Sequence, residues 1–275
     1  MLWFCQELDR RDRVLARMGW FQIALLALML VAMVFDHRTL LGLNVWIKPS
    51  KFAVSIAIYV WTLAWFMPYL TGVRWAKALI RWGTVVAMVT EIVCIAGQAA
   101  RGKTSHFNHD SEFDGNVFGM MGLAIAFSTL LDVLLLILFF VRNVPLATTY
   151  LWGIRCGIFG AILAAGVGVM MAGNGAHSVA GQDGGPGLPI VNWSTQSGDL
   201  RVAHALLLHA LQILPLAGFA LSRARKPATP RGVMAGFVLL TTLYALLCAA
   251  MFRQAVAGRS LVGRYFSVTE QSETL

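Results

Sequence analysis

Long apolar runs separated by short polar segments make up most of this chain. A run of about 20 apolar residues is long enough to cross the hydrocarbon core of a bilayer as a helix. The pattern predicts seven such helices, at residues 18–35, 51–70, 75–99, 116–141, 150–172, 200–221 and 232–254. We therefore expect an all-α, polytopic membrane protein with seven transmembrane helices in one bundle.

The remaining segments fit one membrane domain with polar ends. Residues 1–17 are charged and predict a surface segment, residues 18–255 form the transmembrane domain, and residues 256–275 form a polar tail. The first apolar run is not followed by a small-residue cleavage site, so we interpret it as a retained span. The loop at 173–199 is long for a connector and rich in Gly and Pro, which predicts a rigid lid.

Composition and charge support this class. The 275 residues are 58% hydrophobic and 13% charged, whereas an average soluble domain is about 25% charged. The net charge is +9, but the basic residues lie at span ends, which indicates membrane topology and not nucleic-acid binding. Lys and Arg are modestly more frequent on the side of the N-terminus, which predicts a cytoplasmic N-terminus and an extracytoplasmic C-terminus.

Because the chain crosses the membrane at each span, the connections after the first, third and fifth spans must lie on one side of the membrane. The chain after the seventh span lies on that same side. These connections contain most of the polar chemistry, including His37, His106, His109 and His177. His204 and His209 lie within a few turns of the same side, at the start of the sixth span. The sequence therefore predicts one reactive face, whichever way the protein is oriented.

The sixth span carries an unusual polar arc. Arg201, His204, His209 and Gln212 fall within roughly 140° of a helical wheel, with His204 about 7 Å below Asp199. Ionisable groups at membrane depth normally face the bundle interior and suggest function. The alternatives are hydrogen bonds between helices for the histidines and a helix N-cap for Asp199.

A second stripe descends the third span. Glu91, Cys94, Gln98 and Arg101 recur at helical spacing, and Glu91 lies about 15 Å below Arg101, near the bilayer midplane. A carboxylate at that depth needs protonation or a cation partner. It could serve as a metal ligand, a proton relay or a general base, or simply as a buried hydrogen-bonding group.

Other polar residues are weaker candidates. The segment SHFNHD offers His106 and His109 three apart, which fits either a metal site or a solvated loop pair. Asp132 and Arg155 lie on neighbouring spans, and we expect a structural ion pair between them.

Several of these motifs also carry a resemblance. The strings IKPSKF, GQAARGKTSHFN, DGGPGLP, NWSTQSGDLR and AHALLLHALQ resemble an uncharacterised family of bacterial multi-span membrane proteins, over residues 46–212. This resemblance implies a bacterial inner-membrane protein but no activity. A looser likeness to ceramidase-type seven-span metal hydrolases is set aside, because five residues separate His204 from His209.

Our leading hypothesis is a metal- or haem-dependent membrane enzyme or redox protein that acts on a lipophilic or anionic small molecule. The alternatives are a transporter, channel or ligand-binding receptor, or a membrane assembly subunit. The expected cofactor is Zn, Fe, Cu or haem, and the expected surroundings are the lipid bilayer, with no nucleic-acid partner. The candidate ligands are His106, His177, His204 and His209; the candidate acid/base groups are Glu91 and Asp183; the candidate substrate-binding residues are Lys48, Lys51, Gln98, Arg101, Arg201 and Asp199.

Overall fold

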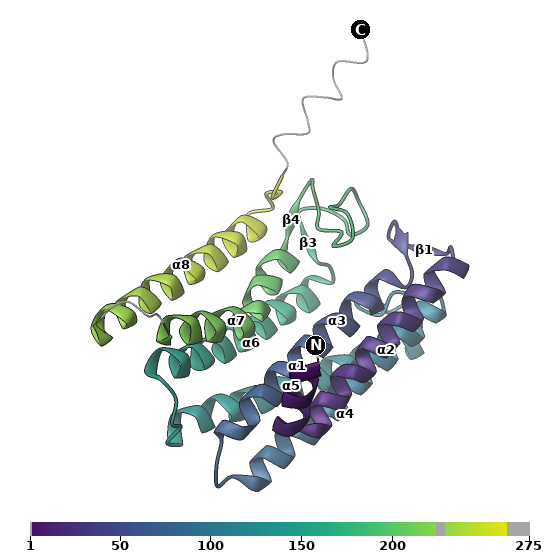
Figure 1. Ribbon diagram of the computed structural model, residues 1–275. Coiled ribbons are helices and arrows are strands. Elements are labelled where there is room, and N and C mark those ends of the chain that lie inside the picture. The colour runs from purple at the N-terminus through teal and green to yellow at the C-terminus, as the bar shows by residue number, and fades with distance from the viewer. Residues whose placement is uncertain (1, 224–228, 263–275) are drawn as a thin grey trace.

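The computed structural model describes residues 2–223 and 229–262 and contains the seven expected spans (Figure 1). A short helix, α1 (Leu2–Arg11), precedes them. The spans are α2 (Arg13–Phe35), α3 (Ile47–Phe66), α4 (Arg74–Ala100), α5 (Glu112–Val141), α6 (Thr148–Asn174), α7 (Leu200–Ser222) and α8 (Pro230–Val256). All seven are long and apolar enough to cross a membrane, so the prediction of an all-α polytopic membrane protein is confirmed.

Three spans, α2, α3 and α5, begin four or five residues earlier than their apolar runs suggest. Asp12 caps α2, because its side chain accepts a hydrogen bond from the backbone N–H of Leu15, and its carboxylate also pairs with Arg81 of α4 at 2.6 Å. The capped helix therefore starts at Arg13 and includes part of the predicted surface segment. Helix α3 starts at Ile47 and ends in a 3-10 turn, η1 (Met67–Tyr69), so Lys48 and Lys51 belong to its first turns.

The helices form a chain of neighbours in which α6 and α7 are packed most closely. Glycines allow that approach: a Cβ atom at Gly153 would lie 2.5 Å from the carbonyl oxygen of Leu214, and one at Gly157 would lie 2.9 Å from that of Ala210. Small residues four apart are a common way for membrane helices to bring their backbones together. Figure 1 shows α8 at the outer edge of the bundle, beside α7.

The connections predicted to share one side do meet at one end of the bundle (Figure 1). A hairpin of β1 (Thr39–Leu40) and β2 (Leu43–Asn44) follows α2, and strands β3 (Ser178–Val179) and β4 (Gly198–Asp199) flank the lid. Asn192 of the lid donates a hydrogen bond to the carbonyl oxygen of Leu41 in the hairpin (3.2 Å). Arg38 donates one to Ala100 at the end of α4 (3.1 Å). The common-face prediction is therefore confirmed.

The expected ion pair between Asp132 and Arg155 is wrong. Asp132 accepts a hydrogen bond from the hydroxyl group of Tyr59 on α3. Arg155 donates two hydrogen bonds to the carbonyl oxygen of Phe139, at 3.0 and 2.8 Å, and its guanidinium stacks on Phe140. Neighbouring spans do not guarantee facing side chains, because the position of each residue around its own helix decides which groups meet.

Candidate functional site

A cavity of about 130 Å³ lies between the hairpin, the start of α3, the end of α4 and the lid. Its floor includes Phe52 of α3 and Ile95 of α4, which pack in one apolar cluster with Cys94 and Met121. The lining residues are Leu40, Leu41, Leu43, Asn44, Val45, Lys48, Pro49, Lys51, Phe52, Ile95, Ala99, Lys103, Thr104, Ser105, His177, Asn192 and Arg201.

Four Lys and Arg side chains supply the charge of this lining. Lys48 and Lys51 come from α3, Lys103 from the loop after α4, and Arg201 from α7, whereas no Asp or Glu is among the described lining residues. The first turn of α3 also has no acidic residue and no side-chain cap. Its unpaired backbone N–H groups therefore add to the positive potential around the cavity.

The four cations are held differently. Lys103 pairs with Asp110 in the loop after α4, at 3.4 Å. Lys51 Nζ donates to the lid carbonyl oxygens of Ile190 (3.2 Å) and Val191 (3.3 Å). Arg201 pairs with Asp199 at 2.6 Å. Among the residues that the structure describes, none accepts a hydrogen bond from the ammonium group of Lys48, which leaves that group available to a ligand.

The lid and hairpin over the cavity are conformationally strained. Among the described residues, every non-glycine residue with positive φ lies in a loop on this face: Leu41 (51°), Phe107 (56°), Ala180 (59°), Ile190 (66°) and Asn192 (55°). Left-handed backbone is a genuine outlier for a β-branched residue such as Ile190. Strained residues of this kind cluster at ligand clamps and active sites, which supports a functional role for this face.

His177 and Asp183 form a close pair at the base of the lid. Asp183 accepts hydrogen bonds from the backbone N–H and the ring Nδ1 of His177, the latter at 2.6 Å, and from the backbone N–H of Ser178. Burial acts to raise the pKa of Asp183, but these hydrogen bonds outweigh it and hold the pKa below its usual range. A carboxylate that stays ionised orients the imidazole but is a poor general acid, so the acid role predicted for Asp183 gains no support.

The histidines predicted as ligands share one feature. The Nδ1 atom of His106 is 3.0 Å from the hydroxyl oxygen of Ser105, and that of His204 is 2.8 Å from the carbonyl oxygen of Ala164. With His177, all three rings are thus fixed through Nδ1, and Nε2 has no hydrogen bond within the described part of the chain. For His177 and His204, whose Nδ1 atoms face an oxygen that can only accept, this is the arrangement in which a histidine offers Nε2 to a metal or a proton.

His106 is the most enclosed of these rings. Burial lowers the pKa of His106 well below its usual range. The charges that lower it further belong to Lys48, His177 and His204, which come from three separate segments. Burial also lowers the pKa of His177, although the hydrogen bond that its ring donates to Asp183 acts in the opposite direction.

The upper part of the α4 stripe is structural and does not line the cavity. Gln98 donates a hydrogen bond to Asp114 of α5 (2.8 Å), and Arg101 pairs with the same carboxylate at 2.6 Å. Ser111 caps α5 by accepting a hydrogen bond from the backbone N–H of Asp114, and its hydroxyl group donates to the Asp114 carboxylate. Gln98 and Arg101 therefore join α4 to α5, instead of facing the cavity as substrate-binding groups.

Asp199 and His209 also lie apart from the cavity lining. Asp199 caps α7 and accepts hydrogen bonds from the backbone N–H groups of Arg201 (2.9 Å) and Ser194 (2.8 Å). It therefore positions Arg201 and the lid. His209 is exposed on the outer surface of α7, whereas His204 is half-buried toward α6, because five residues do not return a helix to the same face.

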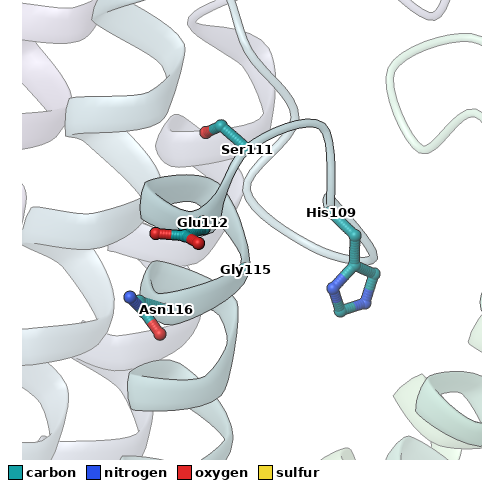
Figure 2. Close-up of a pocket in the computed structure, with 5 residues that line it drawn as sticks. All are labelled: His109, Ser111, Glu112, Gly115 and Asn116. Atoms are coloured by element: carbon teal, nitrogen blue, oxygen red, sulfur yellow. The ribbon is translucent and has the colours of Figure 1, made fainter.

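His109 faces a second depression, at the start of α5 (Figure 2). The figure shows its ring on the loop at one side of the helix, whereas the side chains of Glu112 and Asn116 lie on the other side of its first turns. His106 and His109 both pack on Phe118, with ring centroids 6.0 and 5.8 Å from it. The two histidines of the H-x-x-H pair therefore do not line the same pocket. Within residues 2–223 and 229–262, no group of three or more His, Cys, Asp or Glu side chains is arranged to hold a metal ion.

Sequence reasoning missed three residues that matter here. Lys103 and Asn192 line the cavity, and Tyr59 is the partner of Asp132. Lys103 had a usable signal, since it is a cation in the loop after α4 on the predicted reactive face. Asn192 and Tyr59 had none, because a single polar residue in a loop or an aromatic in a span is common.

Comparison with known proteins finds no matching family model, no matching curated protein and no matching solved structure. The resemblance to an uncharacterised bacterial family stays a prediction. The function must therefore be argued from the geometry of the cavity.

Proposed function

We propose that this integral membrane protein binds a small anionic molecule in the cavity beneath the lid, as a receptor or transporter. The observation that supports the proposal most directly is the lining, which has four cationic side chains and, among the residues that the structure describes, no carboxylate. Such a set attracts carboxylate and phosphate groups. Arg201 contributes less than a free guanidinium would, because Asp199 already accepts hydrogen bonds from it.

The size of the cavity limits the ligand. A volume of about 130 Å³ corresponds to roughly four water molecules at liquid density and is smaller than the pockets of about 300–1,000 Å³ that hold drug-sized ligands. A small carboxylate or inorganic phosphate fits this space. A larger molecule would place only its anionic head group there.

The test is binding of inorganic phosphate and of acetate to purified protein by isothermal titration calorimetry. Lys48→Gln should weaken binding at least tenfold, because the ammonium group of Lys48 has no competing acceptor among the described residues. Lys77→Gln is the matched control, since Lys77 lies on α4 near the opposite end of the bundle. Equal affinities in both variants, or no binding of either anion to the wild type, would refute the proposal.

A metal- or haem-dependent enzyme is the second candidate, and the specific observation in its favour is the set of three histidines fixed through Nδ1. His106, His177 and His204 would offer Nε2 to Zn, Fe or Cu, and haem would need only one or two of them as axial ligands. Elemental analysis and a visible spectrum of the purified protein test this idea. His204→Ala should remove the metal or haem, and His37→Ala should not.

For the location, we propose a bacterial inner membrane with the cavity on the extracytoplasmic side. The modest excess of Lys and Arg on the side of the N-terminus supports this orientation. The bilayer would then surround the spans, and the ligand would reach the cavity from the extracytoplasmic side.

A further inference from the structure

The tip of the lid, residues 188–193, is a compact loop closed by its own hydrogen bonds. The backbone N–H of Leu188 donates to the carbonyl oxygen of Trp193 (2.9 Å), and that of Asn192 donates to the carbonyl oxygen of Leu188 (2.8 Å). The base of the lid is anchored separately, by the pairing of β3 with β4. The tip can therefore move as a unit while the base stays in place.

Cations of the cavity lining hold this tip. Lys51 Nζ donates to the carbonyl oxygens of Ile190 (3.2 Å) and Val191 (3.3 Å). The guanidinium group of Arg201 donates to the next carbonyl oxygen along the chain, that of Asn192. Three consecutive carbonyl groups of the lid therefore occupy donors on two of the four cations that line the cavity.

The held conformation of the tip is strained and weakly secured. Ile190 and Asn192 have φ angles of 66° and 55°, and left-handed backbone is unfavourable for a β-branched residue such as Ile190. The Ile190 side chain is 68% exposed, so burial does little to offset this strain. Both hydrogen bonds from Lys51, and the one of 3.2 Å from Asn192 to Leu41 of the hairpin, are at the long end of the usual range.

The opposite side of the cavity is closed by apolar packing. The floor residues Phe52 and Ile95 belong to a buried apolar cluster. Glu91, one turn below Ile95 on α4, is 2% exposed. A deeper path would take an anion through this cluster and past a carboxyl group, away from water and from the four cations, which is unfavourable. An anion therefore enters and leaves on the side of the loops, where the tip lies.

We propose that the lid tip is a gate that Lys51 holds shut and that a bound anion holds open. This inference rests on the proposed function. A neutral carbonyl oxygen is a weaker acceptor for an ammonium group than a carboxylate or phosphate oxygen. An anion that enters while the tip is open keeps Lys51 for itself, and the strained tip stays away from the hairpin. The anion thus binds the open conformation more tightly than the closed one, which is the differential affinity that such a transition needs.

The distance between two spin labels tests the gate in the full-length protein. The labels are attached at Thr39→Cys in the hairpin and Ile190→Cys in the tip, both exposed positions, in a Cys5→Ser background. Inorganic phosphate should lengthen the 39–190 distance. Lys51→Met keeps the length of the side chain but cannot donate, so it should show the longer distance without phosphate. Lys77→Met, near the opposite end of the bundle, should keep the shorter distance until phosphate is added.

A second measurement leaves Lys51 in place. The same two cysteines, joined by a short cleavable cross-linker, lock the tip on the hairpin without a change in the cavity lining. The cross-linked protein should bind phosphate at least tenfold more weakly than the same protein after the linker is cleaved.

The outcomes separate the gate from the anion site. If phosphate binds but the 39–190 distance does not lengthen, or if the cross-linked and cleaved proteins bind it equally well, the gate is refuted while the anion site stands. A short distance in phosphate-free Lys51→Met would also refute it. If phosphate and acetate both fail to bind the wild type, the proposed function fails and the gate with it.

Discussion

Tyr59 on α3 donates a hydrogen bond to Asp132 on α5, with 2.9 Å between the two oxygen atoms. Ser128, one turn before Asp132, lies 3.3 Å from the same hydroxyl group. Because Asp132 is 9% exposed and has no cationic partner among the described residues, this hydroxyl group is its main source of stabilisation. The contact also fixes α3 against α5 below the cavity.

A double-mutant cycle should show which partner Asp132 has. The coupling free energy between Tyr59→Phe and Asp132→Asn should be about 1 kcal/mol, the usual contribution of a hydrogen bond. The coupling between Asp132→Asn and Arg155→Gln should be below about 0.5 kcal/mol, as for residues that share no partner. Denaturation in detergent, followed by circular dichroism, measures both coupling free energies. A larger coupling of Asp132 with Arg155 than with Tyr59 would instead support the ion pair that the sequence suggested.

The close packing of α6 on α7 gives a second prediction. Gly157→Leu should lower the melting temperature and weaken phosphate binding, because the new side chain would displace α7 and with it Arg201. Gly166→Leu on the same helix is the control, since a Cβ atom at Gly166 meets nothing within 4 Å. Similar melting temperatures for the two variants would show that the approach of the two helices does not depend on glycine.

Acid should destabilise the face that holds the cavity. The pKa values of His106 and His177 are lowered by burial in the folded protein, so below about pH 6.5 the unfolded chain binds more protons than the folded one. Stability is therefore fully present above that pH and decreases as the pH falls. The lowered pKa of Asp183 adds a further loss only below about pH 4.

Melting temperatures between pH 8 and pH 5 measure this effect. The decrease on acidification should be smaller in His106→Gln than in wild type, because that variant has one fewer site that protonates on unfolding. His37→Gln should behave as wild type, since His37 is exposed in the loop after α2. A decrease that is the same in all three proteins would contradict the assignment to His106.

The number of spans, their approximate limits and the common face were predictable from the sequence. Apolar length fixes the spans, and alternation of sides fixes which loops meet. The partner of each polar residue was not predictable, as Arg101 shows: its helical spacing from Glu91 suggested one continuous stripe, but its guanidinium turns to Asp114 of α5. His209 was likewise expected in a polar arc facing the bundle interior but is exposed. The rotation of a helix about its axis, and which neighbouring helix a side chain meets, depend on packing that a single sequence does not specify.

The last prediction concerns sidedness, which the arrangement of helices leaves open. Single cysteines placed at His109 and Gln196, both exposed on the cavity face, should react together with a membrane-impermeant maleimide in intact cells. Cysteines at Arg74 and Ser222, exposed at the opposite end, should react only after permeabilisation, and the background should carry Cys5→Ser, because Cys5 is partly exposed. Labelling of 74 and 222 in intact cells would reverse the orientation and place the anion site in the cytoplasm. Labelling that separates 109 from 196 would contradict the common face itself, and with it the cavity.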